Sequence, residues 1–284
     1  MTQKIIALVD GSIYSASVCE NAAWISNRTA MPVELLHVLG RREPVIRQDL
    51  SGSIRLGART ALLEELAEVE GQRAKLVAQR GRAILEDGEA IVKKAGVADV
   101  TTRLRHGDLV ETVGEVEKDA GLILIGKRGE AVDFAKGHLG SNLERIVRAS
   151  HKPVFVAARA FRAVDKVLVA FDAGMSALKA VDHIARDPLF VGLSVHLVSV
   201  GAASPETQRA LDNARNTLSG AGLAAETRII AGQAETALAQ LVEAEKFDMV
   251  VMGAYGHSRI RSLIIGSTTT GMIRACKVPV MLIR

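Results

Sequence analysis

The chain is poor in aromatic residues and contains no long apolar run. Aromatic residues make up 3% of its 284 residues, so any core must be built from Leu, Ile, Val and Ala. No apolar run reaches the roughly 18 residues that a membrane-spanning helix needs, so we expect no membrane insertion. The hydrophobic share of 48% is nevertheless ample for packed cores, which excludes a disordered chain.

Cysteine is also scarce. Cys19 and Cys276 lie in different halves of the chain, and neither belongs to a Cys-x-x-Cys pair. Two such thiols are more often buried small residues than a disulfide. The first residues enter an apolar strand pattern directly, without the basic, apolar and small-residue layout of a signal peptide. We therefore expect a cytoplasmic protein.

The charge balance is only mildly basic, with a formal net charge of +4. Basic residues are scattered, apart from Arg41-Arg42 and a run between Arg73 and Arg82. The interleaved aromatic residues of a nucleic-acid platform are missing. We expect a solvated basic surface and no specific nucleic-acid partner.

The most informative feature that is present lies near the end of the chain. There an apolar run is followed by Gly253 and Gly256, and after nine further residues Gly266, Ser267 and Thr268 open a helical stretch. A strand that ends in glycines and leads to a helix start offers bare backbone N–H groups and a positive dipole end. Such an arrangement is typical of a phosphate site.

A weaker copy of this pattern lies about half a chain earlier. It consists of Gly126 and Gly129, then ten residues rather than nine, then Gly140 and Ser141. Gly137, inside the longer gap, could absorb a bulge. Finding the pattern twice predicts two tandem domains, which we place at residues 1–158 and 165–284 with a short join between them.

Each half contains five apolar runs separated by amphipathic stretches. Most runs are continuous, as expected of parallel strands that are buried on both faces. The more polar runs at 100–105 and 225–230 are predicted to be edge strands. The predicted strands are 4–9, 33–39, 100–104, 122–125, 154–157, 166–171, 194–200, 225–230, 249–252 and 280–283.

The halves differ by an insertion at about residues 41–95. The first half uses about 60 residues between its second and third strands, whereas the second uses about 25. An apolar stripe indicates a helix there, and Gly71, Gly81 and Gly88 weaken the prediction that this helix is unbroken. The insertion could pack on its own domain, or it could form a lid or a subunit contact.

Ligands of doubly wound sheets bind beyond the carboxyl ends of the strands, where the connections change direction. With strand order 3-2-1-4-5, this point lies between strands one and four. Strand one of each half ends at an acid, Asp10 or Asp172. Each acid could cap the following helix or accept a hydrogen bond from adenine or ribose.

Other chemistry has little support in the sequence. There is no Gly-x-x-x-x-Gly-Lys-Ser/Thr phosphate loop, and the seven histidines form no close pair for a metal ion. Ser141 and Ser267 have no evident base, so they are interpreted as phosphate ligands rather than nucleophiles. Lys127, Arg128, Arg259 and Arg261 could neutralise phosphate charge. We expect no catalytic residues, no metal-binding residues and no enzyme activity.

The whole arrangement resembles the universal stress protein family, in a tandem form that covers nearly all of both halves. The resemblance implies two Rossmann-like, five-stranded parallel sheets of the adenine nucleotide alpha hydrolase-like type. It also implies that the residue ending strand two lies against adenine. The nucleotide-binding residues that it implies are Asp172, Val200, Gly253, Gly256, Gly266, Ser267 and Thr268 in the second half, and Asp10, Val38, Gly126, Gly129, Gly140 and Ser141 in the first.

The first half departs from the family pattern in two places. One is the ten-residue gap, and the other is Gly121, which stands where the second half has the acid Asp248. The second half is therefore the better match to a nucleotide-binding domain.

The resemblance implies ATP or a related adenine nucleotide, with a divalent ion such as Mg²⁺ bridging its phosphates. It further implies that the domains pair through their last strands, whose apolar edges need cover. We expect a nucleotide-dependent stress-response sensor or scaffold. The alternatives are an interaction module without nucleotide and a slow ATPase. The sequence leaves open whether two chains form a homodimer.

Overall fold

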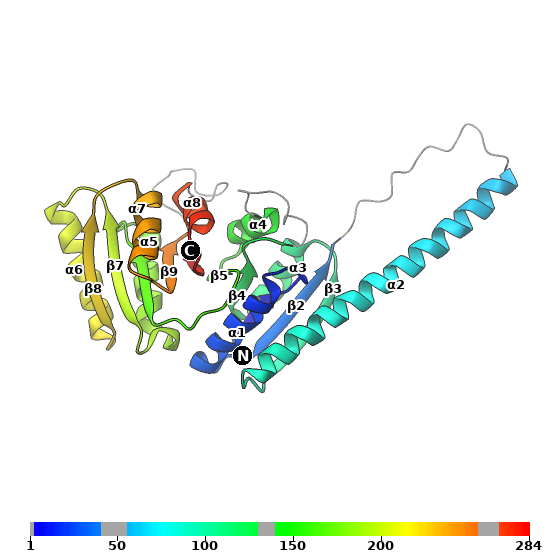
Figure 1. Cartoon of the computed structure of the whole chain (residues 1–284), viewed down its shortest axis with the longest axis horizontal. Helices are drawn as coiled ribbons and strands as arrows, with labels where there is room; N and C mark the ends of the chain where they lie inside the picture. The colour runs from blue at the N-terminus through cyan, green and yellow to red at the C-terminus, as the bar shows by residue number, and fades with distance from the viewer. Residues whose placement is uncertain (1–2, 41–55, 130–139, 255–266) are drawn as a thin grey trace.

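Ten strands form one continuous sheet in the computed structural model, which describes residues 3–40, 56–129, 140–254 and 267–284 (Figure 1). Their order is β3-β2-β1-β4-β5-β10-β9-β6-β7-β8, so each half has the predicted order 3-2-1-4-5. The strands are β1 (Lys4–Leu8), β2 (Val33–Leu39), β3 (Val100–His106), β4 (Ala120–Gly126), β5 (Val154–Ala157), β6 (Lys166–Ala170), β7 (Ser194–Val200), β8 (Ala224–Ile230), β9 (Met249–Gly253) and β10 (Val280–Ile283).

Pairing is parallel within each half and antiparallel between the halves. The antiparallel seam joins β5 to β10, where Phe155 lies opposite Met281. Each terminal strand thereby covers the apolar edge of the other. The two polar strands predicted at sheet edges, β3 and β8, are the two edges of the ten-stranded sheet.

Helices cover both faces of the sheet, as the alternation of strands and helices predicts. Buried side chains of α1, α2, α5 and α6 pack on one face, and those of α3, α4, α7 and α8 pack on the other. The helices are α1 (Ser15–Thr29), α2 (Leu56–Lys94), α3 (Leu109–Val116), α4 (Ser141–Ala149), α5 (Met175–Arg186), α6 (Pro205–Gly220), α7 (Ala234–Ala244) and α8 (Ser267–Ala275), with 3-10 turns η1 (Glu117–Asp119) and η3 (Pro188–Phe190). No described helix is both long and apolar enough to cross a membrane.

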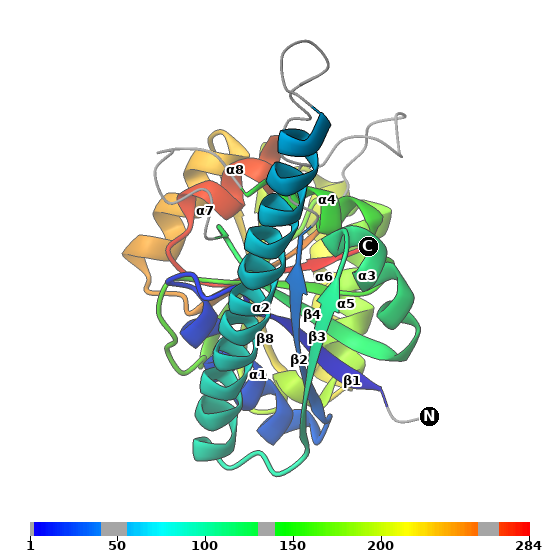
Figure 2. The same cartoon turned by 90° about the vertical axis from the view of Figure 1, so that its right-hand side faces the viewer.

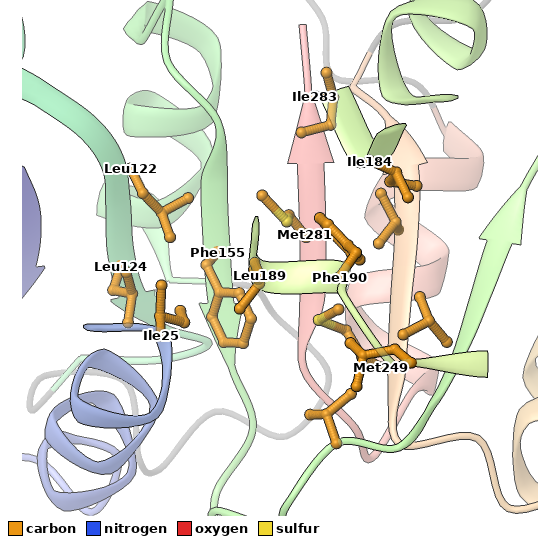
Figure 3. Close-up of a cluster of buried hydrophobic side chains, with 14 of the residues drawn as sticks. Ile25, Leu122, Leu124, Phe155, Ile184, Leu189, Phe190, Met249, Met281 and Ile283 are labelled. Carbon is orange, nitrogen blue, oxygen red and sulfur yellow. The ribbon is translucent and has the colours of Figure 1, made fainter. Parts of the chain in front are cut away.

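The core is continuous across the seam. Phe155, Phe190 and Met281 are fully buried and belong to one cluster that contains residues of both halves (Figure 3). Polar contacts reinforce this junction, because Arg28 Nε donates to the Leu189 carbonyl at 2.8 Å and an Arg284 guanidinium N–H donates to the Ser150 carbonyl at 2.9 Å. The two halves are therefore held together by main-chain pairing, apolar packing and hydrogen bonds.

Within the insertion, residues 56–94 form one unbroken helix of 39 residues, although Gly71, Gly81 and Gly88 weaken the sequence signal for such a helix. A Cβ at Gly81 would lie 2.8 Å from Leu104 Cδ1, and one at Gly88 would lie 3.1 Å from Cys19 Sγ. These glycines let the carboxyl-terminal half of α2 lie close to β3 and α1. The amino-terminal half of α2 projects away from the body of the protein (Figures 1 and 2).

Candidate functional site

The loop after β1 is organised by the carboxylate of Asp10. Its Oδ1 accepts hydrogen bonds from the Ser12 N–H at 3.0 Å and from Ser15 Oγ at 3.2 Å. Gly11 has a φ of +77°, a conformation that glycine adopts without strain, and its N–H donates to Ser15 Oγ at 2.9 Å. Asp10 does not cap α1, whose N-cap residue is Tyr14. The acid instead fixes the turn and faces the end of β4.

The glycines at the end of β4 are required by close approach to this loop. A Cβ on Gly126 would lie 2.6 Å from Tyr14 Cβ, and one on Gly129 would lie 2.8 Å from Asp10 Oδ2. Side-chain carbons essentially never approach other atoms so closely. The two glycines therefore allow the loops after β1 and β4 to meet at the point where the sheet connections change direction.

The start of α4 completes the arrangement. Gly140 is its N-cap residue and provides no side-chain cap, so the N–H groups of the first turn have no acceptor within the helix. The Gly140 N–H itself donates to the Lys127 carbonyl at 3.3 Å. The amides at the start of α4, beginning with that of Ser141, are thus the ones available to an anion, whereas the Gly140 amide is not.

These elements surround a cavity of about 520 Å³. Leu36, Val38 and Ile125 contribute apolar surface from strands near its floor, while Asp10, Arg128 and Ser141 contribute polar groups. All six residues predicted for the first half line this cavity. The residues that complete its wall are Leu8, Val9, Ser12, Tyr14, Ser15, Val18, Gly40, Gly107, Asp108, Leu109, Asn142 and Leu143, together with Gly126, Gly129 and Gly140.

The second half is described only in part. Asp172 Oδ1 accepts from the Gly174 N–H at 2.9 Å, and a Cβ on Gly253 would lie 2.3 Å from Ser176 Oγ. Asp172 thus orders the turn after β6, and Gly253 packs against the start of α5. Val200 ends β7, α8 begins at Ser267, and Thr268 is half-buried within α8. Gly256, Gly266, Arg259 and Arg261 lie outside the described residues.

One protein-family model matches both halves of the chain. The sequence model of the universal stress protein family fits residues 1–158 and again residues 163–284. The chain belongs to the universal stress protein family. It contains two universal stress protein domains in tandem, joined into one sheet.

One full-length relative supports the same assignment, and solved structures show the same fold. The universal stress protein Slr1230 of Synechocystis sp. strain PCC 6803 is 35% identical over 286 aligned positions, which cover 99% of this chain and 100% of that one. A crystal structure of a universal stress protein from Archaeoglobus fulgidus DSM 4304 superposes with a TM-score of 0.72 at 20% identity, covering 100% of this chain and 97% of that one. The functionally unknown protein PA1789 from Pseudomonas aeruginosa PAO1 gives a TM-score of 0.62 at 16% identity, covering 99% and 92%.

In the first universal stress protein domain, sequence reasoning missed the contribution of β3. Asp108 follows β3 and lines the cavity, where its Oδ1 caps α3 by accepting from the Val110 N–H at 2.9 Å. Arg145 donates to Asp108 Oδ2 at 2.8 Å, and this hydrogen bond, aided by the backbone N–H groups, lowers the pKa of the Asp108 carboxyl. The Gly-Asp pair after a predicted strand was the available signal.

The ten residues between Gly129 and Gly140, Gly137 among them, lie outside the described residues, but the ends of this gap and the second departure, Gly121, can be placed. A Cβ on Gly140 would lie 3.7 Å from the Gly129 nitrogen, so the ends of the ten-residue gap are adjacent. The acid that Gly121 replaces has a structural role elsewhere, because Asp248 Oδ2 accepts from the Lys166 N–H at 2.9 Å at the amino ends of the strands. The cavity lies at their carboxyl ends.

Lys127 does not take the phosphate-facing position that its sequence suggests. Its side chain is buried toward the second domain, where Nζ donates to the Cys276 carbonyl. Burial lowers the pKa of the Lys127 ammonium from about 10.5 to about 8, against a smaller opposing influence from Cys276. Arg128, by contrast, lines the cavity. The lysine therefore contributes to the contact between the domains.

We predict that the Lys127→Met substitution changes how stability depends on pH. Between pH 8 and 10.5 the unfolded wild type retains a proton that the folded state has released, so its stability rises with pH. The pKa difference corresponds to roughly 3 kcal/mol. The free energy of unfolding of Lys127→Met minus that of wild type should fall by about this amount from pH 7 to pH 10.5. Urea denaturation at both pH values measures it.

The matched control is Lys118→Met, which removes an exposed lysine in the same domain. Its difference from wild type should stay constant over this pH range. If the difference for Lys127→Met is equally independent of pH, the pKa of the Lys127 ammonium is not lowered by burial.

Proposed function

We propose that the chain binds ATP or a related adenine nucleotide in the cavity of its first domain and acts as a nucleotide-dependent stress-response sensor or scaffold. The observation that carries this proposal is the cavity of about 520 Å³, which all six predicted residues line. Its volume lies within the 300–1,000 Å³ typical of ligand pockets.

The chemistry of the walls suits the parts of a nucleotide. Leu36 and Val38 offer apolar surface for a base, and Asp10 offers carboxylate oxygens for ribose or adenine donors. On the opposite side, the first-turn amides of α4, the Ser141 hydroxyl and the Arg128 guanidinium suit phosphate oxygens. The predicted nucleotide thus runs from the end of β2 to the start of α4.

A divalent ion would be held mainly by the phosphates. Within the described residues, no group of three or more His, Cys, Asp or Glu side chains is placed to hold a metal ion. A Mg²⁺ ion with several waters and few protein ligands is the usual form in nucleotide sites.

The geometry favours binding over turnover. The two carboxylates of the cavity are both engaged, Asp10 with the turn after β1 and Asp108 with the α3 amides and Arg145. These hydrogen bonds tie both carboxylates to the local turn and helix start, which suits the positioning of a ligand better than the activation of water by a general base. This supports a proposed role in nucleotide-dependent contacts with partners rather than in ATP hydrolysis.

The proposal is tested by identifying the small molecules that the purified chain releases when it is denatured, and by titrating ATP into the emptied protein. Mass spectrometry should detect an adenine nucleotide, and calorimetry should show saturable ATP binding. If no adenine nucleotide is released and ATP gives no binding heat, the interaction-module alternative replaces it. Steady ATP hydrolysis that Asp10→Ala abolishes would favour the ATPase alternative.

A further inference from the structure

The amino-terminal half of α2 projects away from the body of the protein (Figure 1), and apolar side chains on it are exposed. Leu66, Val69 and Leu76 are 44%, 57% and 65% exposed. In the docked half of the same helix, Leu85 and Val92 are buried. Leu66, Val69 and Leu76 thus form an exposed apolar strip on α2.

The spacing of this surface is that of a helix–helix seam. Leu66, Val69, Arg73, Leu76 and Arg80 follow one another at alternating steps of three and four residues. Such a repeat places all five on one side of the helix, where they match a second helix packed along it. We call these five residues the α2 seam.

The charges beside the seam are separated into two blocks. The residues from 64 to 70 include four glutamates and no base, whereas those from 73 to 82 include four basic residues and no acid. This layout is unfavourable within one helix, because Glu64 and Glu68 are like charges four residues apart. The acidic residues are Glu64, Glu65, Glu68 and Glu70, and the basic residues are Arg73, Lys75, Arg80 and Arg82.

We propose that the α2 seam binds the α2 seam of a second copy of this chain in an antiparallel orientation. The acidic block of each copy then lies beside the basic block of the other. Leu66 of one copy lies opposite Leu76 of the second copy, and Val69 lies opposite the aliphatic stem of Arg73. The Arg73 guanidinium reaches Glu70 of the second copy, as long cationic side chains do when they flank an apolar contact.

The charges also decide the orientation. In a parallel pair, Arg73 would face Arg73 and Arg80 would face Arg80 of the second copy, and the glutamate blocks would lie side by side. Like charges in these positions oppose association. The antiparallel pair replaces each repulsion with an attraction.

The dimer is expected to be weak. The stretch from Glu64 to Ala78, which pairs with its copy in this register, spans about 21 Å at 1.5 Å per residue. Two helices in contact over this length form an interface at the small end of specific interfaces. We expect a dissociation constant on the order of 10 µM, with monomers and dimers in exchange.

Charge reversal in the full-length chain tests the proposal by sedimentation velocity over a range of protein concentrations. One variant carries Glu65→Lys and Glu70→Lys, and the other carries Arg73→Glu and Lys75→Glu. Each alone should dimerise at least about tenfold more weakly than wild type, and an equimolar mixture should recover dimers. The control Glu86→Lys with Asp87→Lys reverses exposed charges on the docked half of α2 and should leave dimerisation unchanged.

Cysteine cross-linking tests the orientation, because both native cysteines are buried. Chains with Leu66→Cys mixed with chains with Leu76→Cys should form the mixed disulfide faster than either forms its own. Faster 66–66 linkage would indicate a parallel pair and overturn the proposal. A chain that stays monomeric at all concentrations, or dimers that persist in both charge-reversed variants, would overturn it equally.

Discussion

Phe155→Ala is expected to lower the free energy of unfolding by about 3–5 kcal/mol, the usual cost of truncating a fully buried phenylalanine. Phe155 is fully buried in β5 opposite Met281, at the seam where the two halves of the sheet meet (Figure 3). Loss of its ring leaves a cavity that a paired β-sheet seam cannot easily close. The shift of the urea midpoint measures the effect.

The control for this substitution is Met175→Ala, which removes a large apolar side chain that is 71% exposed. It should change the free energy of unfolding by less than about 0.5 kcal/mol. If Phe155→Ala were as mild as this control, the continuous core between the two domains would be wrong. The domains would then be joined by strand pairing and hydrogen bonds without a shared core.

Gly129→Val is expected to reduce ATP affinity about 100-fold, or roughly 2.7 kcal/mol of binding free energy. The new Cβ would lie 2.8 Å from Asp10 Oδ2. Relief of this contact must displace the carboxylate from Ser12 and Ser15 or move the turn after β4, and both line the cavity. Overpacking should also lower the free energy of unfolding by about 1–3 kcal/mol. Calorimetric titration of the folded variant measures the affinity.

Gly114→Val supplies the matched control, because a Cβ on Gly114 in α3 meets no atom within 4 Å. It should bind ATP as wild type does. Unchanged affinity in Gly129→Val would mean that the nucleotide, if bound, lies elsewhere in the chain.

The sheet was predictable because most of its strands coincide with short, continuous apolar runs in the sequence. The runs at 33–39, 154–157, 194–200 and 280–283 have the observed strand boundaries. The polar runs mark the edges, since an edge strand is covered less completely than a central one. These properties are local, so sequence alone reveals them.

The course of α2 was not predictable in the same way. Gly81 and Gly88 each cost helix stability, and helix propensity alone therefore argues for a break. Glycine is needed at these positions for tertiary packing, because Leu104 and Cys19 occupy the space that a side chain would need. Contacts between residues far apart in sequence are not visible in local propensity.

In the candidate site, too, backbone positions could be predicted from the sequence, whereas side-chain contacts could not. Parallel strands bring their carboxyl ends to one edge, so the positions of Asp10, Gly126 and Gly140 could be inferred from strand order. The direction of a long side chain could not, and Lys127 is turned toward the second domain. Sequence position alone also did not show that Asp248, the counterpart of Gly121, bonds main-chain N–H groups at the end of the strands opposite the cavity.

The central claim, an adenine nucleotide in the cavity of the first domain, is tested most directly by photolabelling with an azidoadenosine triphosphate and mapping the labelled peptides. The account predicts label on the segments that contain Val38 or Gly107–Leu109, displaced by excess ATP and greatly reduced in Gly129→Val. The absence of ATP-displaceable label from the first domain would contradict it.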